Sequence, residues 1–445
     1  MGRHSKSLEL KGIPTVGAVA ETMKEYAIDY DFKYNNGMPI RYVAFPFPVA
    51  GQPPEVHKRY VEGKDRLSGK PMMTAIIEGL TKPLTDREQF KGTPPEAKPV
   101  PRFLPPDTAE HLQQLFKDND WTDYNPIILP TEARVKEMLT GTSHAPDEVV
   151  NTINWPGGAR ELTVEKAAIA AVMAGAKPRF MPLILAVATR VPFGNSTSSM
   201  ANMILVNGPI RKELGMNYGT NVMGPHNEVN SVIGRVFTLL SKTVGNLHSG
   251  KTTFSSLGSN LQYNNVTIAE NEENLPKGWK PFHVQMGFKP TDSVVTVATG
   301  WSYISSVGEV QIDYPPQKLI GDYMRSLTAL GSGATIIMDP TVAELIENVQ
   351  GFKSKEDLSK WLSGYVEKTV DSFWGNGVVS TSAATLAMQG LEPYASWRKL
   401  PGDSLIKPFN NPRAIQVVVA GGAIQTTWFV TDFRLGRGVL VDDWR

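Results

Sequence analysis

Two strand-like runs, Pro14-Thr-Val-Gly-Ala-Val-Ala20 and Arg41-Tyr-Val-Ala-Phe-Pro-Phe47, decide the fold of the N-terminal part of this chain. Between them lies a helix-length segment, residues 21–36. A strand, a helix and a second strand form one β-α-β unit, the minimal parallel crossover. A parallel sheet normally buries both faces under helices, which two strands and one helix cannot achieve. We therefore expect residues 1–88 to form an incomplete α/β half-domain, which another part of the chain or a second polypeptide completes.

After the second strand we expect one short helix and then a linker. Residues 89–106 contain six prolines, which exclude both a helix and a central strand. Beyond the linker, residues 107–445 alternate between apolar strand-like runs and helical spacing. This alternation predicts an α/β body with mainly parallel sheets and a subdivision near residues 305–315. The strands are expected at 125–129, 203–207, 292–298, 334–338 and 414–419.

Composition narrows the class of protein. The formal net charge is +1 and no lysine or arginine block stands out, so we expect neither a nucleic-acid nor a membrane partner. The N-terminus lacks the apolar region of a secretory signal, and we expect a cytoplasmic protein. The chain has no cysteine, which excludes a thiolate nucleophile, cysteine-ligated zinc and iron–sulfur clusters from its own residues.

The first candidate site segment is Asn207-Gly-Pro-Ile-Arg211, which begins at the last residue of the strand expected at 203–207. In open α/β sheets, ligands bind at the carboxyl ends of strands. The Asn207 amide and the Arg211 guanidinium can hold a carboxylate or a phosphate. The alternative is a tight turn with a solvated arginine. We predict both residues as substrate-binding.

The second segment, Gly224-Pro-His-Asn227, precedes a helix expected at 227–244. A helix N-terminus favours anions, and a neutral His226 imidazole there can act as a general base or an electrophile. The alternative is that Asn227 only caps the helix and His226 is a loop residue. We predict His226 as catalytic, and Asn227 and Arg235 as substrate-binding.

The third segment is Ala269-Glu-Asn-Glu-Glu273, followed ten residues later by His283. We predict Glu270 as the catalytic partner of His226. Carboxylates with a histidine can also bind a divalent metal, and Glu272, Glu273 and His283 are the candidate ligands. The alternative is a run of surface glutamates.

One further run, residues 245–252, matches the spacing of a phosphate-binding P-loop, Gly-x-x-x-x-Gly-Lys-Thr. A P-loop leaves a strand and opens a helix. Here the preceding segment has helical spacing, and the following one is a poor helix. The context therefore argues against phosphate binding at this run.

Several ordered motifs resemble the large proteins of the UGSC family. They include Asn125-Pro-Ile-Ile-Leu-Pro-Thr-Glu132, residues 163–175, Val206-Asn-Gly-Pro-Ile-Arg211, Ala269-Glu-Asn-Glu-Glu273 and Val418-Val-Ala-Gly-Gly422. That family is named for a reactive motif of selenocysteine or cysteine, Gly, Ser and Cys. The motif precedes an element that this chain has as Glu9-Leu-Lys-Gly-Ile-Pro-Thr15, but the motif itself is missing here.

The resemblance implies a split enzyme. We expect this chain to be the large subunit of a hetero-oligomer that acts on a small polar or anionic substrate. A smaller cysteine-containing subunit would dock on residues 8–48 and supply a thiol, or a metal held at or near the subunit interface, for redox or lyase/hydratase-type chemistry. Two alternatives stay open. One is a non-catalytic scaffold or regulatory paralogue, and the other is a cysteine-independent hydrolase or lyase that uses histidine and glutamate.

Overall fold

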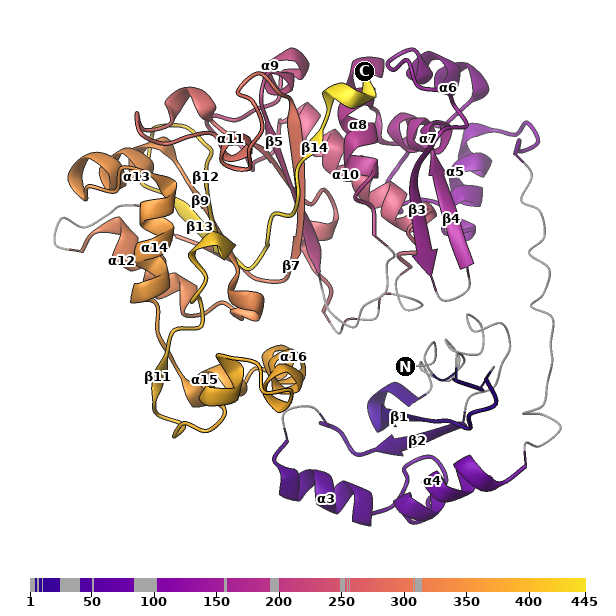
Figure 1. Ribbon diagram of the computed structural model, residues 1–445. Coiled ribbons are helices and arrows are strands. Elements are labelled where there is room, and N and C mark those ends of the chain that lie inside the picture. The colour runs from indigo at the N-terminus through magenta and orange to yellow at the C-terminus, as the bar shows by residue number, and fades with distance from the viewer. Residues whose placement is uncertain are drawn as a thin grey trace. The chain divides into compact units, whose positions relative to one another are not determined.

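The chain separates into two compact units (Figure 1). One consists of Met1–Pro106 with Asn154–Ala159, and the other of Asp107–Ile153 with Arg160–Arg445. Most of the predicted linker lies outside the residues that the structure describes. In this computed structural model these are residues 5, 8–9, 11–24, 41–49, 52–83, 102–155, 158–192, 200–248, 253, 255, 257–306, 308 and 314–445.

Two parallel strands form the sheet of the N-terminal unit. β1 (Val16–Ala20) pairs with β2 (Arg41–Phe45) in parallel register, as predicted. A short 3-10 turn, η1 (Glu21–Met23), follows β1, and residues 25–36 of the predicted helix lie outside the described residues. Two helices follow β2 where one was expected: α3 (Pro54–Glu62) and α4 (Met72–Thr81).

Close packing holds α4 against this small sheet. Gly79 lies so near Val16 that a Cβ at position 79 would fall 2.6 Å from a valine methyl carbon. The Arg41 guanidinium donates to the Gly79 carbonyl at 2.9 Å and so satisfies an end carbonyl of the helix. Asp65 accepts a hydrogen bond from the Ala44 amide at 2.7 Å, which ties the loop after α3 to β2.

Two four-stranded sheets form the centre of the second unit, and two short two-stranded pairs accompany them. The first sheet has the order β14-β7-β5-β6 and the second the order β12-β9-β13-β8. The strands of the first sheet are β5 (Ala201–Asn207), β6 (Val266–Ala269), β7 (Val294–Gly300) and β14 (Val439–Leu440). Those of the second are β8 (Tyr303–Ser305), β9 (Ala334–Met338), β12 (Ile415–Val419) and β13 (Trp428–Thr431). The short pairs are β3 (Val149–Trp155) with β4 (Gly158–Thr163), and β10 (Lys368–Thr369) with β11 (Leu405–Ile406).

The predicted α/β class is confirmed, and both large sheets are mixed. β5 pairs with β6, and β9 with β12, in parallel, whereas the other pairs of these sheets are antiparallel. Alternation along a sequence indicates that helices join the strands. It does not show whether a connection returns the chain to the end of the sheet where the previous strand began. Such a return makes two strands parallel, and without it they are antiparallel.

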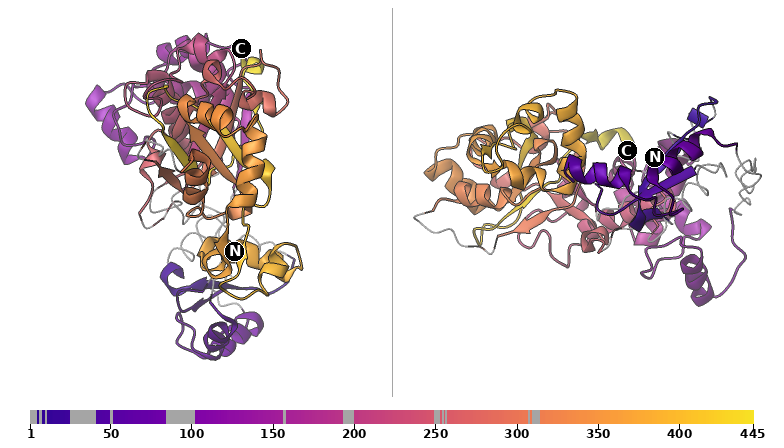
Figure 2. Two further views of the ribbon diagram at one scale, coloured as in Figure 1. Left: turned by 90° about the vertical axis from the view of Figure 1, so that its left-hand side faces the viewer. Right: turned by 90° about the horizontal axis from the view of Figure 1, so that it is seen from below.

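Helices cover the outer face of each sheet, so the unit has four layers, α/β/β/α. Along β5, Ile204 and Val206 pack with the helical core of α7, α8 and α10, whereas Met203 and Leu205 face the second sheet. Ile336 of β9 packs with α12 and α14 on the opposite side. Figure 1 shows the two helical layers on either side of the strands, and Figure 2 shows α12 and α14 in front of the second sheet. The helices are α5 (Ala109–Asp118), α6 (Glu132–Leu139), α7 (Val164–Ala174), α8 (Met181–Ala188), α9 (Ile210–Leu214), α10 (Glu228–Thr243), α11 (Phe282–Gln285), α12 (Pro316–Met324), α13 (Pro340–Glu344), α14 (Lys355–Tyr365), α15 (Val370–Trp374), α16 (Gly377–Met388) and α17 (Tyr394–Trp397).

One predicted strand is wrong. Residues 125–129 form no strand and belong to no sheet. Pro126 has no amide hydrogen to donate, and the Ile127 amide bonds to the Gln113 side chain instead of to a strand. Burial of Ile127 explains why the run looks like a strand in sequence.

The chain passes from the first sheet to the second between β7 and β8, just before the subdivision expected near 305–315. Both sheets nevertheless belong to one compact unit. In the part of the chain that the structure describes, no helix is long and apolar enough to cross a membrane.

Candidate functional site

The carboxyl ends of β5 and β6 place Asn207 and Glu270 side by side. The two strands are parallel neighbours, with Val206 opposite Ala269, so the residues that follow leave the sheet at the same edge. Asn207 Nδ2 donates to Glu270 Oε2 at 2.6 Å. Both side chains are completely buried, which makes this edge a polar centre inside the unit.

Arg211 of α9 joins the same centre. The turn before it needs a glycine, because Gly208 has a φ of +82° and a Cβ there would fall 2.0 Å from a neighbouring carbonyl oxygen. Arg211 is 2% exposed and donates Nη1 to the main-chain oxygen of Glu270 at 2.6 Å. Its guanidinium also pairs with the carboxylates of Glu272, at 3.0 Å, and Glu273, at 3.1 Å.

Two carboxylates of the 3-10 turn η4 (Glu272–Asn274) close the cluster. Glu272 Oε1 accepts from Asn207 Nδ2 at 3.0 Å and from the Gly208 amide at 2.8 Å. Burial would raise the pKa of Glu273, but hydrogen bonds from Arg211 and Lys212 lower it to about 2. Glu273 is therefore ionised at neutral pH, and its side chain, 34% exposed, marks the solvent side of the cluster.

Lys355 is the member of this cluster that sequence reasoning missed. It follows the N-cap Ser354 as the first residue of α14, and its Nζ lies 2.6 Å from Glu270 Oε1. The two side chains are 1% and 0% exposed. A lysine in the first turn of a helix opposes the helix dipole, and this unfavourable position is the sequence signal that could have found it. The Phe282 amide donates to the other oxygen of Glu270 at 2.6 Å.

The unfilled hydrogen-bonding capacity of the centre lies at His283 and Asn207. His283 of α11 is completely buried, and neither ring nitrogen has a hydrogen-bond partner among the described residues. Its Nδ1 lies 3.7 Å from Glu272 Oε1. Asn207 Oδ1 is also buried and has no hydrogen-bond partner in the described part of the chain. Buried polar atoms without partners are rare in folded proteins and call for an explanation.

The candidate metal ligands Glu272, Glu273 and His283 do not form a metal centre. Within the ranges described, no group of three or more His, Asp or Glu side chains is arranged to hold a metal ion. The physical reason is that Arg211 and Lys212 already neutralise the carboxylates of η4.

His226 and Asn227 lie outside this hydrogen-bonded cluster. His226 is exposed in the loop before α10, has a φ of +74°, and makes no hydrogen bond or ion pair with any described residue. Asn227 Nδ2 donates to the carbonyl oxygens of Asn221 and Gly224, so it holds the loop together. The predicted pairing of His226 with Glu270 is therefore not among the contacts of the described residues.

Arg235 also serves a different contact from the one predicted. Its Nε and Nη2 donate to the Asp123 carboxylate at 2.8 and 3.1 Å, and Nη2 also reaches the Pro126 carbonyl oxygen at 2.8 Å. These hydrogen bonds of the forked guanidinium tie α10 to Asp123 and to Pro126, which lies in the segment 125–129 that was predicted as a strand. The planar geometry of the guanidinium matches the carboxylate, as is typical of arginine.

The P-loop-like run 245–252 gains no structural support. Helix α10 ends at Thr243, directly before the run, whereas a P-loop leaves a strand. Lys251 and the residues beside it lie outside the described residues. His248 Nδ1 lies 2.6 Å from Asp120 Oδ2, in a pair that joins this run to the loop after α5.

Comparisons with known proteins returned no match for this chain among protein-family models, curated proteins or solved structures. The resemblance to the UGSC family therefore rests on the sequence motifs alone.

Proposed function

We propose that this chain is the large subunit of a cytoplasmic hetero-oligomeric enzyme that acts on a small polar or anionic substrate. The observation that carries the proposal is the buried ion pair of Lys355 and Glu270 beside His283, whose ring nitrogens make no hydrogen bond with the described residues. A buried ion pair contributes less to folding stability than well-packed apolar groups would in the same place, because both charges lose their hydration. Such arrangements gather at functional sites, where charges and burial tune the groups that react.

The contacts assign different roles to the residues of the centre. Glu270 receives hydrogen bonds on both carboxylate oxygens, so it holds the centre together rather than acting as a base. The ring nitrogens of His283 have no hydrogen-bond partner among the described residues, so His283 takes the acid/base role, with Glu272 oriented toward Nδ1. Asn207 Oδ1 is the acceptor for a polar group of the substrate. Access would be from the side of Glu273, past the turn η4.

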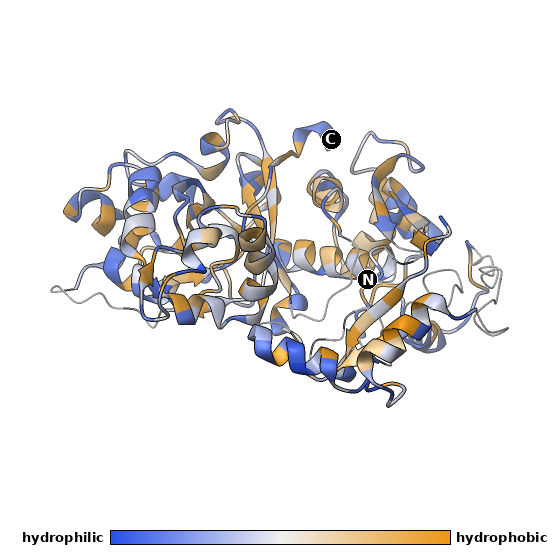
Figure 3. Cartoon of the chain, turned by 60° about the horizontal axis from the view of Figure 1, so that its bottom comes forward, coloured by the Kyte–Doolittle hydropathy of each residue, from blue (hydrophilic) through white to orange (hydrophobic). Residues whose placement is uncertain are grey.

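The proposed partner subunit supplies what this chain lacks. Because these 445 residues include no cysteine, the proposed partner subunit would supply the thiol or thiol-ligated metal for redox or lyase/hydratase-type chemistry. Among the described residues, β1 and β2 pair only with each other, and an added strand would extend either edge. The exposed face of α4, formed by Met73, Ile77 and Leu80, offers apolar surface nearby, and Figure 3 shows the apolar character of this helix.

Thiol titration of the native assembly tests the partner. A tagged copy is purified from the native host, and accessible thiols are counted in the denatured assembly with an aromatic disulfide reagent. Because this chain contributes none, every thiol counted belongs to a bound partner. We expect a stoichiometric smaller subunit with closely spaced cysteines. A folded, active and thiol-free monomer would refute the split-enzyme proposal.

Variants of two histidines test the site. The assembly is incubated with a small-molecule extract of the host, and depletion of polar metabolites is followed by mass spectrometry. His283→Gln should abolish a depletion that the wild type produces, whereas the exposed His226→Gln should retain it. A thermal melt of each variant separates lost chemistry from lost folding. Full depletion by a folded His283→Gln variant would exclude the assigned role.

A cysteine-independent hydrolase or lyase remains the second candidate. It is favoured by the approach of His283 to Glu272 inside one chain, since a histidine and a carboxylate can share general acid/base work. Depletion of the same metabolite by the purified chain alone, lost in His283→Gln, would support this alternative over the split enzyme.

A further inference from the structure

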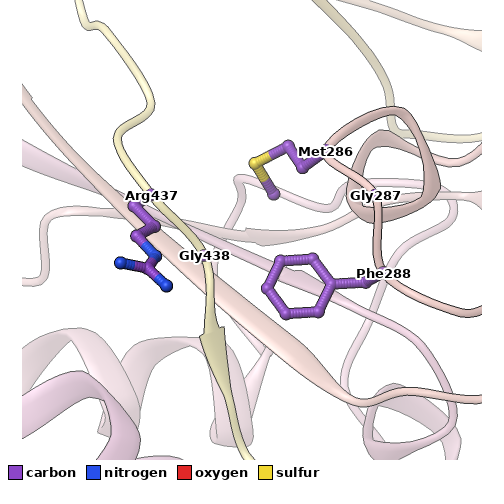
Figure 4. Close-up of a pocket in the computed structure, with 5 residues that line it drawn as sticks. All are labelled: Met286, Gly287, Phe288, Arg437 and Gly438. Carbon is purple, nitrogen blue, oxygen red and sulfur yellow. The ribbon is translucent and has the colours of Figure 1, made fainter.

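A separate pocket of about 400 Å³ opens between the turn after α11 and the segment before β14 (Figure 4). Its lining residues are Met286, Gly287, Phe288, Arg437 and Gly438. Figure 4 shows the thioether and the phenyl ring on one side and the Arg437 side chain on the other. The volume lies within the range of small-molecule sites, about 300–1,000 Å³.

Both walls of the pocket are held by the backbone. The amides of Met286 and Phe288 each donate to the His283 carbonyl oxygen at 3.1 Å. On the other side, the Arg437 carbonyl oxygen accepts from Arg190 Nη2 at 3.1 Å, and β14 pairs with β7 just beyond it. A site whose walls are already ordered loses little conformational entropy when a ligand binds.

Gly438 is required by the way the pocket is packed. A Cβ at this position would fall 2.7 Å from Phe288 Cε2 and 3.2 Å from Met286 Cε. The missing side chain lets the phenyl ring and the thioether lie directly against the backbone that carries Arg437.

Arg437 provides a cation that no described residue neutralises. Its guanidinium makes no hydrogen bond or ion pair with any described residue. The Arg190 guanidinium donates to the Arg437 carbonyl oxygen and so adds a second positive charge on the same side of the pocket. An arginine fork binds a carboxylate bidentately, and a phenyl ring and a thioether favour an aromatic body.

We propose that this pocket binds a small aromatic monocarboxylate, with the carboxylate on Arg437 and the ring against Phe288 and Met286. The site is distinct from the polar centre, and the proposal does not depend on the proposed enzyme function. Because the Met286 and Phe288 amides bond to the His283 carbonyl oxygen, the two sites share the α11 turn.

Benzoate is the probe for the test. The full chain is labelled with ¹³C at the methionine methyl groups, and Met286→Leu assigns the Met286 signal. We expect benzoate to shift this signal with a dissociation constant of about 1 mM, as befits so small a ligand. Benzyl alcohol, which has the ring but no charge, should bind at least about tenfold more weakly than benzoate.

Two arginine variants complete the test. Arg437→Gln should weaken benzoate binding by about tenfold or more, because the charge-assisted hydrogen bonds are lost. Arg413→Gln is the matched control, since Arg413 is likewise exposed and its side chain makes no hydrogen bond or ion pair with the described residues. It should bind benzoate as the wild type does. No shift of the Met286 signal at 20-fold excess over that constant (about 20 mM), equal binding of benzyl alcohol, or undiminished binding by Arg437→Gln would each overturn the proposal.

Discussion

Removing the Lys355 ammonium tests the buried ion pair at the heart of the polar centre. Lys355→Met keeps most of the volume of the side-chain stem and deletes the charge. Glu270, completely buried, then retains the Asn207 amide and the Phe282 amide as donors but has lost its cation at 2.6 Å. Breaking a buried pair from one side costs about 3–5 kcal/mol, because an uncompensated charge stays inside.

The expected effect is a clear drop in thermal stability. At about 2 °C per kcal/mol, the value for larger domains, Lys355→Met should lower the melting temperature by about 6 °C or more. Lys353→Met is the matched control two positions away. Lys353 pairs with Glu347 at 3.1 Å, but its side chain is 68% exposed. We expect that change to cost about 1 kcal/mol or less.

A double-mutant cycle with Glu270→Gln isolates the pair itself. If the cost comes from an unpaired carboxylate, the double variant should be less destabilised than the sum of the two single variants, with a coupling of about 0.5–3 kcal/mol. The assay is thermal unfolding followed by calorimetry on the full chain. Equal melting temperatures for the Lys353 and Lys355 variants, or strict additivity in the cycle, would refute the reasoning.

Three other contacts lead to measurable expectations. The hydrogen bond with Glu148 raises the pKa of His144, so this pair stabilises the protein fully below about pH 6.5 and less as the pH rises through the folded-state pKa. The melting-temperature gap between wild type and His144→Gln should therefore shrink between about pH 6 and about pH 9. Burial alone would raise the pKa of Asp65, but a serine hydroxyl and backbone amides hold it below its usual value. The stability that Asp65 contributes is thus complete above about pH 4, and the gap to Asp65→Asn should close on acidification. Arg235→Lys keeps the charge but loses the fork to Asp123, so it should lower the melting temperature by about 2 °C or more, and Arg235→Met should lower it further.

Each of these expectations has an outcome that contradicts it. A His144→Gln gap that widens with rising pH would mean that the histidine is not stabilised as a cation. An Asp65→Asn gap that persists in acid would mean that the carboxylate charge is not what matters. An Arg235→Lys variant as stable as the wild type would show that the fork geometry contributes nothing.

The polar centre also shows how strand-end reasoning succeeds and where it stops. Glu270 was predicted from its place in a run of carboxylates, and the parallel strand β6 that brings it to the edge where β5 ends was not predicted. Asn207 was predicted because it ends an apolar run that forms a strand, and ligands bind at such strand ends. Arg211, two residues past the Gly208-Pro209 turn, follows from the same logic. By contrast, the argument that placed His226 at a helix N-terminus was local, and an exposed loop satisfies that pattern equally well.

The sequence by itself determined the α/β class, the parallel pairing of β1 with β2 and the absence of any thiol in this chain. These are properties of short-range patterns and of composition, and a single chain displays them directly. The four-layer stacking, the mixed strand directions and the meeting of Lys355 with Glu270 were decided only by the tertiary structure. The physical reason is that burial and partnership depend on which distant segments share a layer. A lysine becomes part of a buried pair only when a helix 85 residues away in sequence begins at the edge where the strands end.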